Sequence, residues 1–208
     1  ISGLLCSGIV AYFHRNIQKM KQDILEEGAV YHIFNRGNNK ENIFRTEDNY
    51  FYFLNKATFY LKPYYDVYAY CLMPNHFHFL LRVREINKQS ASKPRSLAQP
   101  LSNLFNSYTR SYNNYFVRTG SLFQEHYRRE RVKTDEYFIN IFIYIHNNPV
   151  HHKFVSEAKD YKWSSWNAYL KSGSNLLMME YPLQVFDGIE AMEFLINSRK
   201  EILLDKSF

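Results

Sequence analysis

The residues best suited to chemistry are two histidines one residue apart, His76 and His78, in a chain of 208 residues. They begin a β-rich run, residues 76–84 (HFHFLLRVR), in which alternation sends both imidazoles to one face and Phe77 to the other. Two imidazoles side by side can bind one divalent metal ion. The same pattern also fits two polar strand residues that face solvent, so a metal site needs support from elsewhere in the sequence.

A second group of chemical residues lies in a predicted helix that ends in YIHNNPV, residues 144–150. Tyr144 and Asn148 are spaced i, i+4, so the phenol and the amide share one helix face. His146 lies two residues after Tyr144 and projects to a different face, which makes it a weaker ligand candidate. Because the chain has 18 tyrosines, a core Tyr144 and a C-terminal Asn148 before Pro149 are the plain alternative.

These groups need a scaffold, and the hydrophobic pattern predicts one. Thr46 and Thr134 are good N-caps, and Pro149 is expected to stop the helix that Thr134 begins. The expected elements are, in order, a strand at 29–34, a helix at 47–62, strands at 65–72 and 76–84, a polar loop at 85–96, a helix at 97–116, a basic strand at 122–132, the helix from Thr134, an aromatic segment at 161–170 and a helix around 188–204. This order predicts an α+β fold, with a mainly antiparallel sheet and helices on one face.

The composition limits the class of protein. With 46% hydrophobic and 22% charged residues, general disorder is excluded. The formal net charge is +6, and an acidic excess after residue 174 leaves the charge on the body of the chain. A moderately basic body favours an anionic partner. Only two cysteines are present, so a disulfide scaffold is not expected and an intracellular, cytoplasmic location is the simplest interpretation.

Several motifs together carry a family resemblance. The chain resembles the IS200-like transposase superfamily of HUH (His-hydrophobe-His) single-tyrosine nucleases, and is most similar to the REP-associated tyrosine transposases. The matching stretches are YHIFNRG at 31–37, MPNHFHFLLR at 73–82, GSLFQ at 120–124, YIHNNPV at 144–150 and WSS at 163–165. The resemblance implies a ferredoxin-like HUH nuclease fold over residues 28–170. Residues 1–27 are then an N-terminal lead-in or a mis-assigned start, and residues 171–208 an acidic, helical C-terminal extension.

The resemblance also implies roles for single residues. His76 and His78 match the HUH metal ligands, and Asn148 matches the polar residue that completes the metal site, where related insertion-sequence transposases use Gln. Tyr144 matches the nucleophile. The expected activity is a Mg²⁺- or Mn²⁺-dependent cleavage and strand transfer of hairpin-bearing single-stranded DNA, through a covalent 5′-phosphotyrosine that leaves a free 3′-hydroxyl.

Basic residues near aromatic side chains are candidates for binding the DNA, because single strands need phosphate neutralisation and base stacking. A solvated strand face explains the same residues equally well. The main cluster comprises Arg118, Arg128, Arg129, Arg131 and Lys133, flanked by Phe116, Phe123 and Tyr127. A turn after the first strand adds Asn35 and Arg36, and the polar loop adds Lys93 and Arg95 as weaker candidates.

Other functions fit the same residues less well. A hairpin-binding protein without cleavage activity is the main alternative, although all four residues expected in the active site, His76, His78, Tyr144 and Asn148, are present. A histidine-triad hydrolase would need a third His where Leu80 stands. A replication initiator or relaxase of the wider HUH class is less consistent with YIHNNPV. No membrane association is expected, since the apolar segment at 1–13 is too short to span a bilayer. The sequence leaves open a monomer or a homodimer, and a mobile-element or a domesticated gene.

Overall fold

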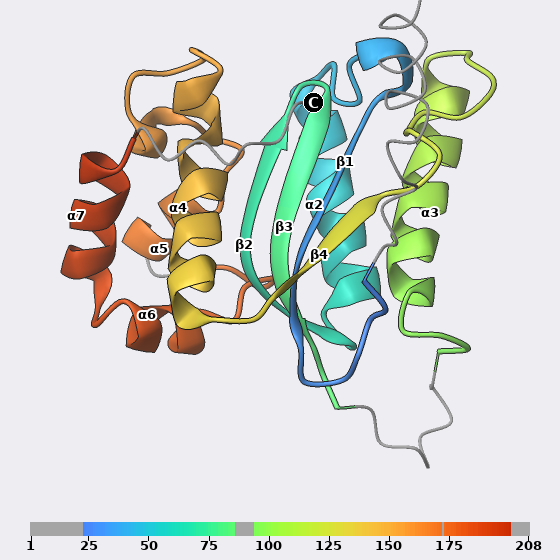
Figure 1. Cartoon of the computed structure of the whole chain (residues 1–208). Helices are drawn as coiled ribbons and strands as arrows, with labels where there is room; N and C mark the ends of the chain where they lie inside the picture. Colours follow the sequence, from blue (N-terminus) through green and yellow to red (C-terminus); the bar gives the residue numbers. More distant parts are fainter. Residues whose placement is uncertain (1–22, 86–93, 172, 201–208) are drawn as a thin grey trace, which may run out of the picture.

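The fold is centred on a four-stranded antiparallel sheet, seen in a computed structural model that describes residues 23–85, 94–171 and 173–200. The strands are β1 (Val30–Arg36), β2 (Tyr65–Met73), β3 (His76–Val83) and β4 (Arg128–Val132). Their order across the sheet is β2-β3-β1-β4, with every neighbouring pair antiparallel (Figure 1). With a helix after β1 and another after β3, this is the ferredoxin-like arrangement, so the α+β prediction is confirmed.

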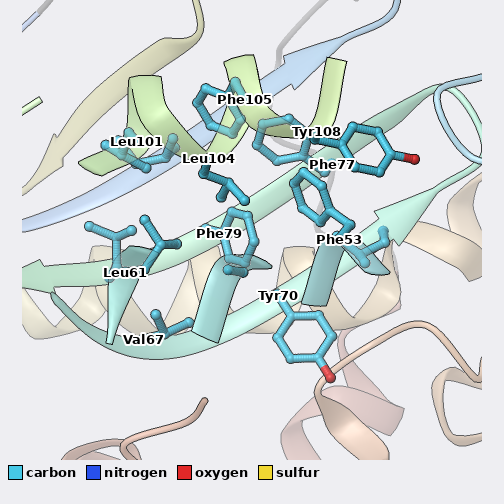
Figure 2. Packing of buried hydrophobic residues seen from close by; sticks show 14 of the residues in the cluster. Phe53, Leu61, Val67, Tyr70, Phe77, Phe79, Leu101, Leu104, Phe105 and Tyr108 are labelled. Carbon is cyan, nitrogen blue, oxygen red and sulfur yellow. The ribbon is translucent and has the colours of Figure 1, made fainter. Parts of the chain in front are cut away.

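Two long helices, α2 (Glu47–Leu61) and α3 (Gln99–Tyr115), cover one face of the sheet. Phe77 and Phe79 of β3 point into this layer and pack with Phe53 of α2 and Phe105 of α3. Figure 2 shows this aromatic and aliphatic core, in which apolar side chains of both helices lie against the odd-numbered residues of β3. Burying these side chains is the main stabilising contribution to the sheet.

The opposite face of the sheet is covered as well, by α4 (Asp135–His151). In Figure 1, α4 and α3 lie on opposite sides of the strands. Leu80 of β3 and Val132 of β4 pack here with Ile141 and Ile145 of α4. The expectation of helices on one face is therefore wrong in this respect. The strands are buried on both sides, which is why β3 is apolar at successive positions.

The C-terminal segments extend the layer around α4. They comprise the short helices η2 (Ala158–Asp160), α5 (Trp166–Lys171), α6 (Glu180–Val185) and α7 (Ile189–Ser198). Met192 and Ile196 of α7 are fully buried in the same core as α4, and Asn147 donates a hydrogen bond to the Ile196 carbonyl at 2.8 Å. The helix expected around 188–204 corresponds to α7, and residues 201–208 lie outside the described ranges.

Two predicted element boundaries differ from the structure. The basic strand expected at 122–132 is shorter in the structure, where β4 covers only Arg128–Val132. Leu122 and Phe123 lie before it and pack into the core between the sheet and helices α2 and α3. The helix that Thr134 caps continues past Pro149 to His151. Pro149 stands in the last turn, so it removes only one helical hydrogen bond, while the Pro149 carbonyl still accepts from Phe154 at 2.9 Å.

The first strand and the turn after it are held by a close backbone approach. This turn continues into η1 (Asn38–Lys40). A Cβ on Gly37 would lie 2.2 Å from the Glu41 carbonyl oxygen, so only glycine fits there without a shift. The Gly37 N–H also donates to the Asn75 carbonyl at 2.8 Å, which ties the turn to the segment just before His76. Most of the 1–27 lead-in lies outside the described residues. Among the residues that the structure describes, no helix is long and apolar enough to cross a membrane.

Candidate active site

The two histidines of the HFH run lie side by side on the face of β3 that α4 covers. His76 is 6% exposed and His78 is fully buried, with their ring centroids 5.3 Å apart. The alternation predicted for Phe77 is present, since its ring lies in the opposite core. The alternative of two solvent-facing polar residues does not hold, because both imidazoles are enclosed between sheet and helix.

Helix α4 brings Tyr144 and Asn148 onto these histidines. The Asn148 amide lies between the two rings, with Oδ1 at 3.0 Å from His76 Nε2 and Nδ2 at 3.4 Å from His78 Nε2. The Tyr144 ring meets the His78 ring edge-on, with centroids 5.4 Å apart. Four residues predicted from two separate motifs therefore lie together, on adjacent elements that the sequence separates by about 70 positions.

The nitrogen atoms that face Asn148 are those that a metal ion would use. His76 Nδ1 lies 2.7 Å from Asn75 Oδ1, so with that oxygen accepting, Nδ1 carries the proton and Nε2 carries the lone pair. Burial lowers the pKa of His76 to about 4, which keeps the ring neutral at physiological pH. His76 Nε2 and Asn148 Oδ1 lie 3.0 Å apart: with the proton on Nε2 they form a hydrogen bond, and with the proton on Nδ1 both atoms present lone pairs that one cation can share.

The groups that could hold a metal ion here are the two imidazoles of His76 and His78 and the amide of Asn148. Within the described ranges, no three His, Cys, Asp or Glu side chains gather as a metal-binding group. Imidazole suits Mn²⁺ better than Mg²⁺, which prefers oxygen ligands, and both tolerate an amide oxygen. The residues present fit a divalent ion that retains open positions for other ligands.

The tyrosine of the site is enclosed. Tyr144 is 5% exposed, and burial raises its pKa to about 12, an effect that the hydrogen bond from Asn148 partly offsets. The Glu130 carboxylate adds to the rise. The phenol is therefore protonated at rest, and its use as a nucleophile requires positive charge near its oxygen as the bond forms.

His146, the weaker ligand candidate, lies outside this group. It is fully buried on another face of α4, where Nδ1–H donates to the Phe142 carbonyl at 2.9 Å and Nε2 lies 2.7 Å from Ser165 Oγ. Burial lowers its pKa to about 3, so the ring is neutral and Nε2 accepts from Ser165. Ser165 in turn accepts from the Tyr70 N–H at 2.9 Å, so His146 connects α4 to β2, and these hydrogen bonds do not involve His76, His78 or Asn148.

A histidine that motif reasoning did not single out belongs to the site. His32 of β1 is fully buried, and its Nε2 lies 2.9 Å from His78 Nδ1, with the two rings stacked at 5.1 Å. Its ring also meets Tyr144 edge-on at 6.3 Å. His32 stands inside the YHIFNRG stretch, but it has no spacing relation to His78. The signal that could have found it is a histidine at an inward position of the neighbouring strand.

The candidate DNA-binding residues nearest the site are Arg36 and Arg128. Arg36 pairs with His76 across β1 and β3, and its charge lowers the pKa of that histidine. A cavity of about 340 Å³ opens beside His76 and is lined by Arg36, Lys40 and His152 among others. Arg128 is exposed at the start of β4, on the same sheet face. Phosphate oxygens could reach the site through this basic opening.

The other basic candidates have different surroundings. Arg118 forms an ion pair with Glu41 and also donates to the Ser121 carbonyl at 2.8 Å, so it holds the loop after α3. Arg131 is similarly paired with Glu26 at 2.6 Å. Both guanidinium groups form ion pairs within the chain, and a role for either in DNA binding stays a prediction.

The remaining candidates lie on or near a second groove. Arg129 lines a groove of about 1100 Å³ on the α3 side, over the Tyr127 ring, and its buried Nε has no hydrogen-bond partner among the described residues. Asn35 lines the same groove, with Nδ2 donating to the Gln124 carbonyl at 3.2 Å. Lys133 and Arg95 are exposed, and Lys93 lies outside the described residues.

Fold and site together define a class of protein: a ferredoxin-like domain in which a helix on the far sheet face sets a tyrosine and an amide against a histidine pair. The family profile described as "Transposase IS200 like" matches residues 26–148. The chain belongs to this family.

The chain is also similar to two individual proteins. The chain is 24% identical over 110 residues to a Haemophilus influenzae (strain ATCC 51907 / DSM 11121 / KW20 / Rd) protein named "Putative REP-associated tyrosine transposase"; the match covers 52% of this chain and 62% of that protein. A solved structure of a REP-associated tyrosine transposase bound to a REP hairpin superposes with a TM-score of 0.59 at 13% identity. It covers 77% of this chain and 92% of that one, and it supports the fold.

Proposed function

We propose that the protein is a metal-dependent, single-stranded DNA endonuclease and strand transferase that acts on hairpin-bearing DNA. One observation carries the proposal: among the tyrosines of the described chain, Tyr144 is the one that lies against both His78 and the Asn148 amide. Metal-assisted phosphodiester transfer by a tyrosine requires a nucleophilic hydroxyl beside groups that can hold a divalent ion, and two imidazoles with an amide can hold one. Membership of the IS200-like transposase family supports the same reaction.

In the proposed reaction, the Tyr144 hydroxyl oxygen bonds to the phosphorus of one DNA phosphodiester. The Tyr144 proton is lost, and the 3′-oxygen leaves with a proton, so the products are a 5′-phosphotyrosine and a free 3′-hydroxyl. One phosphodiester replaces another, so a 3′-hydroxyl can reverse the step and transfer the strand without ATP. A divalent ion bound by His76, His78 and Asn148 would supply positive charge at the scissile phosphate.

The chain's own residues prepare this step. Burial of Tyr144 between α4 and β3 excludes water from the nucleophile, and Asn148 orients its hydroxyl through a hydrogen bond. Arg36 lines the opening beside His76 and also a smaller pocket that it shares with the exposed Arg128, so both guanidinium groups favour a phosphate near the site. The relative whose structure holds a REP hairpin supports a hairpin as the substrate feature.

The test is a cleavage assay on labelled single-stranded DNA that carries a hairpin, with Mg²⁺ or Mn²⁺. Wild-type protein is expected to form a denaturant-resistant protein–DNA adduct only when metal is present, and Tyr144→Phe is expected to form none. Tyr169→Phe is the matched control, because this buried hydroxyl donates to the Tyr68 carbonyl at 2.7 Å and lies outside the site. Tight binding of the correct hairpin without any adduct would contradict cleavage and favour a binding protein.

A further inference from the structure

The metal ligand His78 is held by a second histidine from the neighbouring strand. His32 Nε2 and His78 Nδ1 are 2.9 Å apart, and both rings are fully buried. Phe34, two residues along β1, stacks on His32 with centroids 4.7 Å apart and keeps that ring in place. The contact is therefore a fixed feature between β1 and β3, next to the site and facing away from the Asn148 amide.

Only one direction of this hydrogen bond leaves His78 able to bind a metal. If His32 Nε2–H donated to His78 Nδ1, a neutral His78 would carry its proton on Nε2, which could not then coordinate. If His78 Nδ1–H donates to His32, the His78 Nε2 lone pair points toward Asn148. The Asn148 side chain favours the second direction, because it presents its NH₂ donor to His78 Nε2 at 3.4 Å.

The surroundings of His32 favour the same direction. As an acceptor at Nε2, neutral His32 carries its proton on Nδ1, which needs an acceptor. Glu130 lies directly across from His32 in the β1–β4 pairing, and residues so placed have Cβ atoms about 5 Å apart. The Glu130 carboxylate accepts from the Tyr137 hydroxyl at 3.2 Å and is close enough to Tyr144 to raise its pKa. A carboxylate thus lies on the strand next to His32, on the face of the site.

We propose that His32 is a positioning residue that fixes the tautomer and orientation of His78, by accepting the His78 Nδ1–H with Glu130 behind it. This inference rests on the proposed function, since it concerns a ligand of that site. It extends the site from β3 and α4 to β1 and β4. Removing such an outer partner of a metal-binding histidine typically weakens metal affinity by about 10–100-fold.

The direct test is the protonation pattern of the His78 ring, measured by ¹⁵N NMR on metal-free, DNA-free protein with labelled histidines. The expected result is a proton on His78 Nδ1 and none on Nε2. A proton on Nε2 would overturn the proposal. This measurement uses the wild-type protein, so it decides the question even if a His32 variant does not fold.

The second test is Mn²⁺ binding by the DNA-free protein, followed by electron paramagnetic resonance. His32→Phe keeps a ring against Phe34 but removes the acceptor, and is expected to bind Mn²⁺ about 10–100-fold more weakly. His32→Gln retains a side-chain oxygen that can accept the Nδ1–H, and is expected to recover most of that loss. Equal Mn²⁺ affinity in wild type and His32→Phe, with thermal unfolding unchanged, would contradict a positioning role.

The outcomes separate this inference from the proposed function. A wild-type protein that forms the Tyr144 adduct but shows Nε2-protonated His78 would overturn the inference and leave the function standing. A wild-type protein with the expected His78 tautomer that forms no adduct would overturn the function and leave the His32–His78 relation standing.

Discussion

The structural role of His146 predicts how stability depends on pH. The ring is fully buried and neutral, with a folded-state pKa of about 3 against about 6.5 in an unfolded chain. Because the folded pKa is depressed, the unfolded chain takes up the proton first as pH falls. Stability from His146 is therefore fully present above about pH 6.5 and is lost as pH falls toward 3. Linkage gives a loss of about 1.3 kcal/mol between pH 7.0 and pH 5.5 at 25 °C.

The assay is urea unfolding of wild type and His146→Gln at both pH values. Glutamine does not titrate, so the variant is expected to lose about 1.3 kcal/mol less than wild type over this interval, whatever its stability at pH 7.0. His126→Gln is the control for a histidine-to-glutamine change outside the core, because the His126 side chain is exposed. An identical pH dependence for wild type and His146→Gln would refute the burial argument. A large loss of Mn²⁺ affinity in His146→Gln would instead support a ligand role.

Three further predictions follow from the turn, the opening and the site. Gly37→Ala places a Cβ on the Glu41 carbonyl and is expected to lower the free energy of unfolding by about 1–3 kcal/mol, measured by denaturation; an unchanged midpoint would contradict the close approach. Arg128→Ala is expected to weaken hairpin binding and reduce the salt slope by about 1, whereas Arg118→Ala should lose stability and keep the slope. Asn148→Leu removes the amide at similar volume and is expected to abolish Mn²⁺ binding, while Asn148→Gln keeps measurable binding; equal titration curves for the two would refute the amide ligand.

Much of the site follows from periodicity in the sequence. The strand period of two places His76 and His78 on one face, and the helix spacing of four places Tyr144 above Asn148. Both relations are local, so they can be read before any tertiary structure is known. The contact between the two motifs depends on tertiary structure. In the sequence, only the family resemblance predicts that contact.

The features that could not be predicted from the sequence depend on contacts between residues that are far apart along the chain. His32 joins the site only because β1 pairs with β3, which brings together residues 46 positions apart. The sequence also does not show that Arg118 and Arg131, two DNA-binding candidates, have Glu41 and Glu26 beside them. The position of α4 on the second sheet face is also not readable from the sequence. Apolar residues at successive positions of β3 indicate that both faces of the strand are buried, but they do not show which helix covers each face.

The continuation of α4 past Pro149 shows how tertiary packing overrides a local signal. Ile145, Asn148 and Pro149 are all buried, and that burial stabilises the last turn against the loss of one backbone hydrogen bond. The turn holds Asn148 in helical position one turn after Tyr144, as the proposed site requires.

The residue proposed to become joined to the DNA is Tyr144. The most direct measurement is peptide mapping by mass spectrometry of the adduct formed by wild-type protein on hairpin-bearing single-stranded DNA with Mn²⁺. We expect one modified peptide, with the 5′-phosphate of the DNA on the Tyr144 oxygen. A phosphodiester on another tyrosine, or an adduct that persists in Tyr144→Phe, would contradict it.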